Sequence, residues 1–138
     1  MTIERFEDLE CWKEARVLVN TVYEAINSSE KFKGDYQLKN QITDAAVSSM
    51  SNIAEGFSRH TNKEFIQYLF ISKSSATEAQ SEAYVALDQK YITQKAFENI
   101  YSQAEKVSRL DSGLISYLLE NEKHYKKSKA VHKTQETQ

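Results

Sequence analysis

Histidine, cysteine and clustered acidic side chains are the groups that most often carry catalysis or bind metals, and this chain holds few in a useful pattern. Its one cysteine is Cys11, and its three histidines are His60, His124 and His132. Metal centres need clustered ligands at short spacing, and di-metal helical bundles use Glu-x-x-His pairs, which the sequence lacks. A nucleophilic pair would have to join Cys11 to His60 across the fold. We therefore interpret Cys11 as a passive small residue beside Trp12.

Glycine and proline, which shape phosphate-binding loops and tight turns, are scarce. There is no proline, and Gly34, Gly56 and Gly113 stand alone, so no glycine-rich phosphate loop is predicted. We predict no catalytic site, no metal and no cofactor, and expect that the protein is not an enzyme. The same scarcity favours long helices, because proline breaks a helix, glycine weakens it, and sheets need more turn residues than these.

Apolar residues recur at spacings of three and four along four segments, which is typical of amphipathic helices. The segments are about 8–28, 36–58, 61–87 and 93–121, joined by short connections. Helices joined in this way favour antiparallel neighbours, so we predict an all-α, up-down-up-down four-helix bundle. The stripe of the fourth segment, for example, is Phe97, Ile100, Ala104, Val107, Leu110, Leu114 and Leu118.

Three residues predict where helices begin. Thr61 is followed three residues later by Glu64, which is the pattern of a capping box at the start of the third helix. Thr93 is a suitable N-cap for the fourth helix, and Asp35 is a candidate N-cap for the second. The middle of the third helix is rich in serine and alanine, whose small side chains let a neighbouring helix approach closely.

The charge of the chain is unevenly spread along it. Residues 122–138 hold five lysines and two glutamates, so they carry +3, whereas the whole chain carries −2 and residues 1–121 therefore carry −5. The last seventeen residues also lack an apolar stripe. We predict a folded bundle domain over 1–121 and a polar, Lys-rich, disordered C-terminal tail over 122–138.

Three features favour a cytoplasmic protein without a membrane partner. The first six residues lack the apolar stretch of a signal peptide, and the longest obvious apolar run, Tyr68-Leu69-Phe70-Ile71, is far shorter than the roughly 20 residues of a membrane span. A single cysteine also excludes an intramolecular disulfide, which suits a reducing compartment.

One stretch of the second segment is distinctive: Ser-Asn-Ile-Ala-Glu-Gly over 51–56, followed closely by Arg59. Asn52 is a poor helix former and would be retained if its amide bridges helices or subunits. Glu55 and Arg59 have the order and spacing of a helical ion pair. Gly56 either permits a close helix approach or helps to end the helix. We interpret these four residues as a structural corner or subunit contact, the alternative being a ligand or nucleic-acid site.

This stretch resembles the hallmark of the bacterial four-helix-bundle proteins called 23S-rRNA intervening-sequence proteins. The likeness covers about residues 6–119 and implies the four-helix fold without a catalytic activity. The chain departs from the family at Met50, where proline is common, and this should leave the second helix straighter. Other shared features are Phe6-Glu7-Asp8-Leu9 leading to Trp12, Gln41, and Lys63-Glu64-Phe65 followed by Ser74, Ser75 and Glu78.

The resemblance also implies an assembly. The family is similar to the accessory protein of diversity-generating retroelements, a pentameric barrel that binds nucleic acid and a reverse transcriptase. We therefore expect a homo-oligomer, a pentamer, that acts as a scaffold or assembly protein. The alternative is an accessory module that binds nucleic acid or a nucleic-acid-processing protein, although the acidic body gives no global attraction to phosphates. Its candidate contacts are Lys39, Arg59, Lys63, Lys126 and Lys127.

Overall fold

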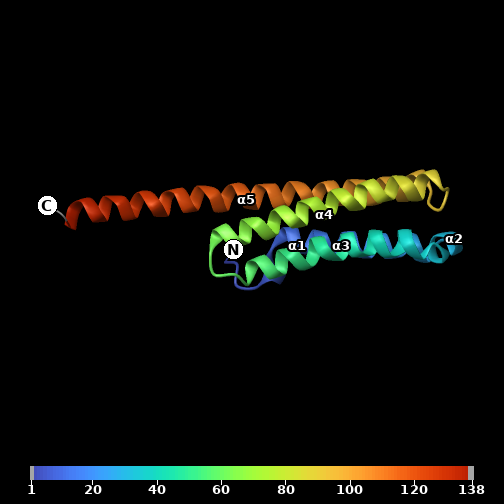
Figure 1. The fold of residues 1–138 in the computed structure, drawn as a ribbon, viewed down its shortest axis with the longest axis horizontal. Helices are drawn as coiled ribbons and strands as arrows, with labels where there is room; N and C mark the ends of the chain where they lie inside the picture. The colour runs from blue at the N-terminus through green and yellow to red at the C-terminus, as the bar shows by residue number, and fades with distance from the viewer. Residues whose placement is uncertain (1, 137–138) are drawn as a thin grey trace.

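The computed structural model describes the backbone of residues 2–136 and the side chains of residues 2–121. Figure 1 shows long helices lying side by side. The short α2 is inserted between the first two long helices, and each of the four long helices begins close to the start of a predicted segment. In chain order the elements are the 3-10 turn η1 (Phe6–Asp8) and the helices α1 (Glu10–Asn27), α2 (Glu30–Gly34), α3 (Tyr36–Phe57), α4 (Asn62–Asp88) and α5 (Gln94–Glu136).

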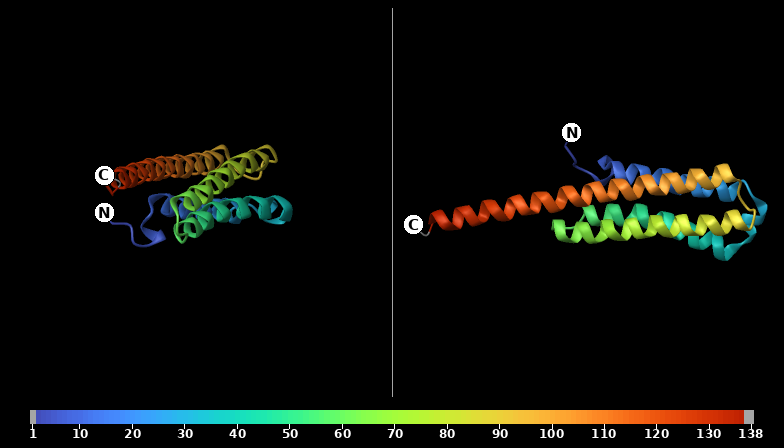
Figure 2. Two further views of the ribbon diagram at one scale, coloured as in Figure 1. Left: turned by 60° about the vertical axis from the view of Figure 1, so that its left-hand side comes forward. Right: turned by 90° about the horizontal axis from the view of Figure 1, so that it is seen from above.

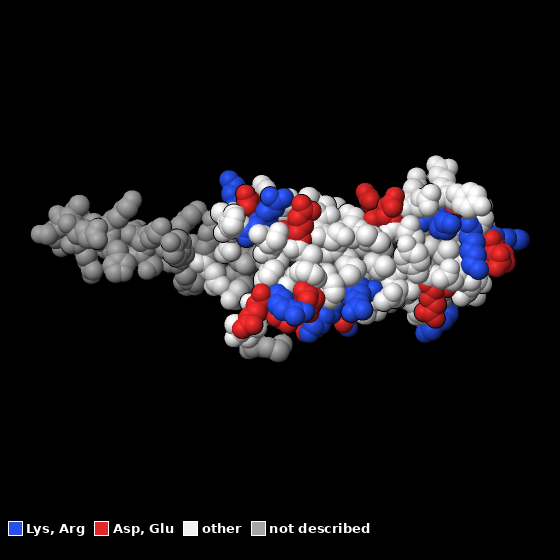
Figure 3. All heavy atoms as spheres, turned by 90° about the horizontal axis from the view of Figure 1, so that it is seen from below, with Lys and Arg blue, Asp and Glu red and all other residues white. Residues whose placement is uncertain are grey.

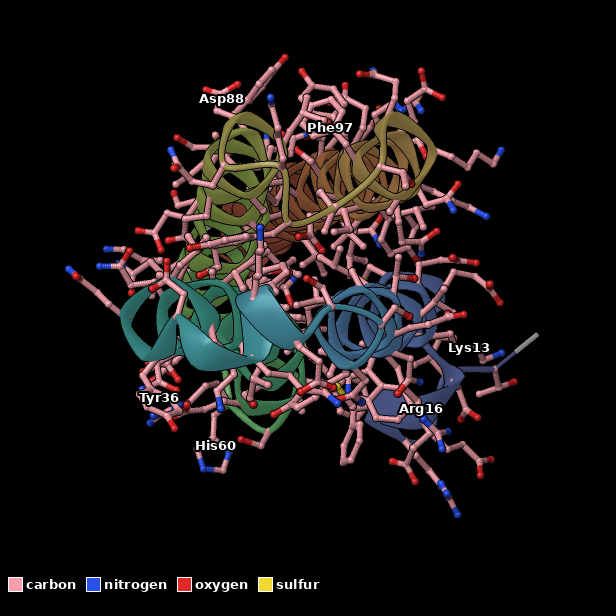
Figure 4. The ribbon with its side chains drawn as sticks, turned by 90° about the vertical axis from the view of Figure 1, so that its right-hand side faces the viewer. Lys13, Arg16, Tyr36, His60, Asp88 and Phe97 are labelled. Atoms are coloured by element: carbon pink, nitrogen blue, oxygen red, sulfur yellow. The ribbon has the colours of Figure 1, made fainter. Side chains whose placement is uncertain are left out.

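The four long helices form the predicted antiparallel bundle. Successive long helices run in opposite directions, which the two further views in Figure 2 also show. Seen from one end in Figure 4, they stand at the corners of a square, with α3 between α1 and α4, and α5 between α4 and α1. Short connections make consecutive helices neighbours, so the up-down-up-down, all-α prediction is confirmed.

The predicted helix starts are capped by their own side chains. Thr61 Oγ1 accepts a hydrogen bond from the N–H of Glu64 at 3.2 Å, at the start of α4. Asp35 Oδ1 accepts from the N–H of Leu38 at 3.1 Å, and Thr93 Oγ1 accepts from that of Ala96 at 3.1 Å. A cap of this kind contributes about 0.5–2 kcal/mol, so each helix start is encoded locally.

The core contains large aliphatic side chains and a face of small ones. Leu18, Ile42, Leu69 and Ile100 come from the four long helices, and all are fully buried. The small-residue face of α4 is turned inwards, toward α3 and α5, rather than outwards. Its buried members are Ser72, Ser75, Ala76, Ala79, Ala83 and Ala86.

The fourth predicted helix does not end near Asn121. The backbone of α5 continues as helix to Glu136, and Figure 1 shows it extending past the ends of the other helices. Residues 122–136 contain neither proline nor glycine and are rich in good helix formers, so no residue type there stops the helix. The predicted tail, 122–138, lies outside the residues whose side chains are described.

Candidate functional site

The distinctive stretch of α3 lies where this helix ends and the chain turns into α4. A Cβ atom placed on Gly56 would lie 2.7 Å from the Cβ of Tyr68 and 2.9 Å from Cδ1 of Phe65. Carbon atoms do not pack at such distances, so α4 could not stay where it is beside a larger residue. Close helix approach is therefore the role that the geometry gives Gly56.

Arg59 is held at this corner by two partners. Its Nη2 lies 3.2 Å from Glu55 Oε1, which is the ion pair predicted from the spacing of these residues. Arg59 also donates to the hydroxyl of Tyr68, and its guanidinium lies 4.9 Å from the centroid of that ring. Tyr68 and then Glu55 raise the pKa of Arg59 above its usual value. The guanidinium is exposed but already bound within the corner.

Asn52 contributes to a polar contact between α3 and α4. Its Nδ2 donates to the carbonyl of Ser48 at 2.8 Å and to the hydroxyl oxygen of Ser48 at 3.0 Å. The Ser48 hydroxyl in turn lies 2.9 Å from that of Ser75 on α4. The amide therefore finds its partners within α3, and it reaches the neighbouring helix through Ser48.

The cationic residues predicted to contact nucleic acid do not form one surface. Arg59 and Lys63 lie at the α3–α4 corner, whereas Lys39 lies near the opposite end of α3. There Lys39 Nζ lies 5.0 Å from the centroid of the exposed Tyr36 ring. The remaining candidates, Lys126 and Lys127, fall outside the residues whose side chains are described.

The structure also reveals a polar cluster that the sequence stripes missed. Asp111 of α5 is fully buried, and its Oδ2 accepts a hydrogen bond of 2.6 Å from the hydroxyl of Ser72 on α4. Ser72 is also 2.9 Å from the hydroxyl of Ser49 on α3, and Cys11 of α1 lies beside the carboxyl. We call these four residues, Cys11, Ser49, Ser72 and Asp111, the buried polar layer.

A signal for Asp111 was present in the sequence. Asp111 lies four residues after Val107 and seven residues before Leu118. It therefore lies on the same face of the helix as these two apolar residues. The predicted stripe instead contains Leu110 and Leu114, and both are half-buried in the structure. A charged residue at a core position of a helix is itself unusual enough to mark a special site.

A shallow groove between α3 and α4 is lined with acidic residues. Asp44, Glu78 and Glu82 lie along it, together with Gln41 and Ser48. Burial, followed by the nearby Glu78 and Asp44, raises the pKa of Glu82 to about 7. Among the residues whose side chains are described, no group of three or more histidine, cysteine or acidic residues is placed to hold a metal ion.

Cys11 and His60, the two residues of a conceivable nucleophilic pair, lie in different surroundings. Burial and the neighbouring Asp111 raise the pKa of Cys11 to about 12, which keeps it a neutral thiol. His60 is exposed, and in Figure 4 it points away from the bundle.

Acidic and basic residues are intermixed over α1 and α3, on the face seen in Figure 3. No helix in the described part of the chain combines the length and apolarity that crossing a membrane requires.

A comparison with known protein families identifies the family of this chain. Residues 7–113 match the family described as 23S rRNA-intervening sequence protein. The chain belongs to this family. The matched residues include α1, α3, α4 and the first part of α5, and so contain both the α3–α4 corner and the buried polar layer of this 23S rRNA-intervening sequence protein.

A solved structure has the same fold. It is the crystal structure of a protein of unknown function from the S23 ribosomal protein family of Bacteroides thetaiotaomicron VPI-5482. The TM-score is 0.64 at 22% sequence identity, and the match covers 76% of this chain and 94% of that chain. This likeness supports the fold alone. No curated protein matches the chain.

Proposed function

We propose that this 23S rRNA-intervening sequence protein is a non-enzymatic scaffold that works as a homo-oligomer, a pentamer by resemblance. The observation that carries the proposal is a row of exposed, uncharged side chains on the outer face of α4. We call this row the α4 seam, and its members are Phe70, Ser74, Thr77, Ser81 and Tyr84.

The α4 seam has the composition and spacing of a helix-packing surface. Its members recur at alternating intervals of four and three residues, which is the spacing along which helices pack in coiled coils. Phe70 is 52% exposed and Tyr84 is 50% exposed, and burying such a side chain contributes roughly 1.5–3 kcal/mol. The three small residues between these aromatic rings would let a second helix come close.

A second copy of the chain is the occupant that the surroundings of the seam favour. By helical geometry, Lys73 and Glu78 lie on opposite edges of the α4 seam. Adjacent copies could therefore set unlike charges against each other while burying the uncharged centre, and such pairs fix register and orientation. The small-residue face of α4 is already buried inside the protomer and is not available to a second copy.

The test is the mass of the purified protein by light scattering, measured for the wild type and for Ser74→Lys. A lysine in the centre of a packed interface is strongly disfavoured, so we expect the assembly, with five times the mass of the chain, to give way to smaller species. Asn20→Lys on α1 is the matched control. Asn20 is exposed, and Glu24 follows it at four residues just as Glu78 follows Ser74. It should leave the mass unchanged.

A monomeric wild type at micromolar concentration would overturn the proposal as a whole. An assembly whose mass is the same in the wild type and in Ser74→Lys would instead exclude the α4 seam as its interface. Far-UV circular dichroism of both variants checks that the bundle itself is intact.

Nucleic-acid binding is the second candidate function, and one observation favours it. Tyr36 is 69% exposed with Lys39 beside its ring, and Lys31 and Lys33 of α2 precede it in the chain. An exposed aromatic ring among lysines can stack a base while the lysines contact phosphates. Stacking contributes about 1–3 kcal/mol per base, so Tyr36→Ala should weaken binding by roughly fivefold to 150-fold.

Fluorescence anisotropy with a labelled single-stranded RNA, at low and at physiological salt, measures this second function. Tyr23→Ala is the matched control, since Tyr23 is an exposed tyrosine on α1. Binding should weaken as salt rises, because each contacted phosphate releases counterions. The candidate fails if the wild type retains no RNA at low salt, or if both tyrosine variants bind equally well.

A further inference from the structure

The buried polar layer has a fixed direction of proton donation at its α3 end. Ser72 donates its hydroxyl proton to Asp111 Oδ2. A hydroxyl has only one proton to give, so Ser49 must be the donor in its contact with Ser72. The layer thus runs from Ser49 on α3 through Ser72 on α4 to the Asp111 carboxyl on α5, which accepts the last hydrogen bond of the chain.

The burial of Asp111 favours a neutral carboxyl. Cys11 of α1 is a neutral thiol, α3 contributes only the hydroxyl of Ser49, and Lys73 of α4 is the charged side chain that acts on the carboxyl. Within the described part of the chain, Asp111 Oδ1 has no hydrogen-bond partner. An ionised carboxylate in this position would be a buried charge with one of its oxygens unsatisfied, which folding strongly disfavours.

We propose that Asp111 is a proton-dependent latch, which holds α5 against α1 and α4 when its carboxyl is protonated and loosens that contact when it ionises. The latch makes the closure of the bundle sensitive to pH in the neutral range. This property is independent of whether the chain assembles with itself or binds nucleic acid.

The sign of the expected pH dependence follows from the proton balance. Burial raises the pKa of Asp111 from 3.8 to about 7, while Ser72, Cys11 and Lys73 lower it by less. Between these two values the folded chain holds a proton that the unfolded chain has released. The stabilisation is therefore complete below about pH 4 and is lost as the pH rises through about 7.

Urea unfolding between pH 5 and 9 tests the latch with the full chain. The Asp111 proton should make the folding equilibrium constant fall by up to roughly tenfold per pH unit until about pH 7. Asp111→Asn should remove this one-proton part of the wild-type slope and be the more stable protein above pH 8. Glu82→Gln is the control, because Glu82 also has a pKa raised to about 7 and contributes its own slope from outside the layer.

Cys11 gives a second readout that is local to the latch. It is the one cysteine of the chain, and it is buried beside Asp111. Labelling by a thiol reagent at pH 8.5 therefore measures how often the layer opens. We expect the wild type and Glu82→Gln to react at similar rates, and Asp111→Asn to react at least tenfold more slowly. Equal rates in the wild type and Asp111→Asn, or equal pH slopes, would overturn the proposal.

Ser72→Ala provides a further test that leaves the carboxyl in place. The Ser72 hydroxyl favours the ionised form of Asp111 by donating to it. Its removal should therefore shift the pH at which the thiol becomes reactive upwards. An unchanged or lowered transition in Ser72→Ala would contradict the latch even if Asp111→Asn does not fold.

Discussion

Replacing Gly56 by even the smallest side chain should destabilise the bundle. A methyl group in Gly56→Ala would collide with Tyr68 and Phe65 of α4, and overpacking of this kind costs about 1–3 kcal/mol. The matched control is Gly113→Ala on α5, where a Cβ meets nothing within 4 Å and a better helix former should stabilise by about 0.5–1 kcal/mol. Urea unfolding measures both changes, and equal effects would contradict the assigned role.

At this scale the sequence predicts contacts within one helix but not those between helices. The ion pair of Glu55 and Arg59 follows from a four-residue spacing, and it is present at 3.2 Å. Tyr68, the other partner of Arg59, comes from the next helix, and no periodicity could have paired the two. Asp111 escapes prediction for a different reason, because a stripe defined by hydrophobicity excludes a charged residue even where its position faces the core.

The elements themselves are strongly encoded. Helix starts depend on local hydrogen bonds, so Thr61 and Thr93 could each be identified from residue type and spacing alone. The face that a helix turns toward the core is less strongly encoded than its start, because neighbouring stripes on one helix can both be apolar. On α1, the apolar Trp12 and Val19 are half-buried, whereas Cys11 and Leu18, the residues that precede them, lie deeper in the core.

The order of the helices around the bundle was predictable, whereas the use of their faces was not. Short connections dictate antiparallel neighbours. The small residues of α4, for example, predicted that a helix packs closely against them but not which one, and the structure turns them inwards toward α3 and α5. Exposed aromatic side chains on the opposite face of α4 became visible only once its partners were known. The proposed self-association therefore depends on the whole arrangement rather than on a motif.

The extent of the folding domain is the remaining whole-molecule prediction. Among the residues whose side chains are described, the last buried one is Leu118, so a chain that ends at Asn121 retains every described core contact. We expect this truncation to unfold cooperatively, with a urea midpoint close to that of the full chain. A chain that ends at Gly113 loses the buried Ile115 and Leu118 as well. Removing a buried aliphatic side chain costs about 2–5 kcal/mol, so this shorter control should be severely destabilised.

A loss of several kcal/mol in the chain that ends at Asn121 would contradict a domain boundary at that residue. It would show that residues 122–138 support the bundle, even though the core is complete without them. Light scattering of the same truncation shows whether such a loss of stability comes from contacts between copies or from contacts within one protomer. If the 122–138 segment acts between copies, the mass will fall together with the midpoint, whereas a contribution within one protomer would leave the mass unchanged.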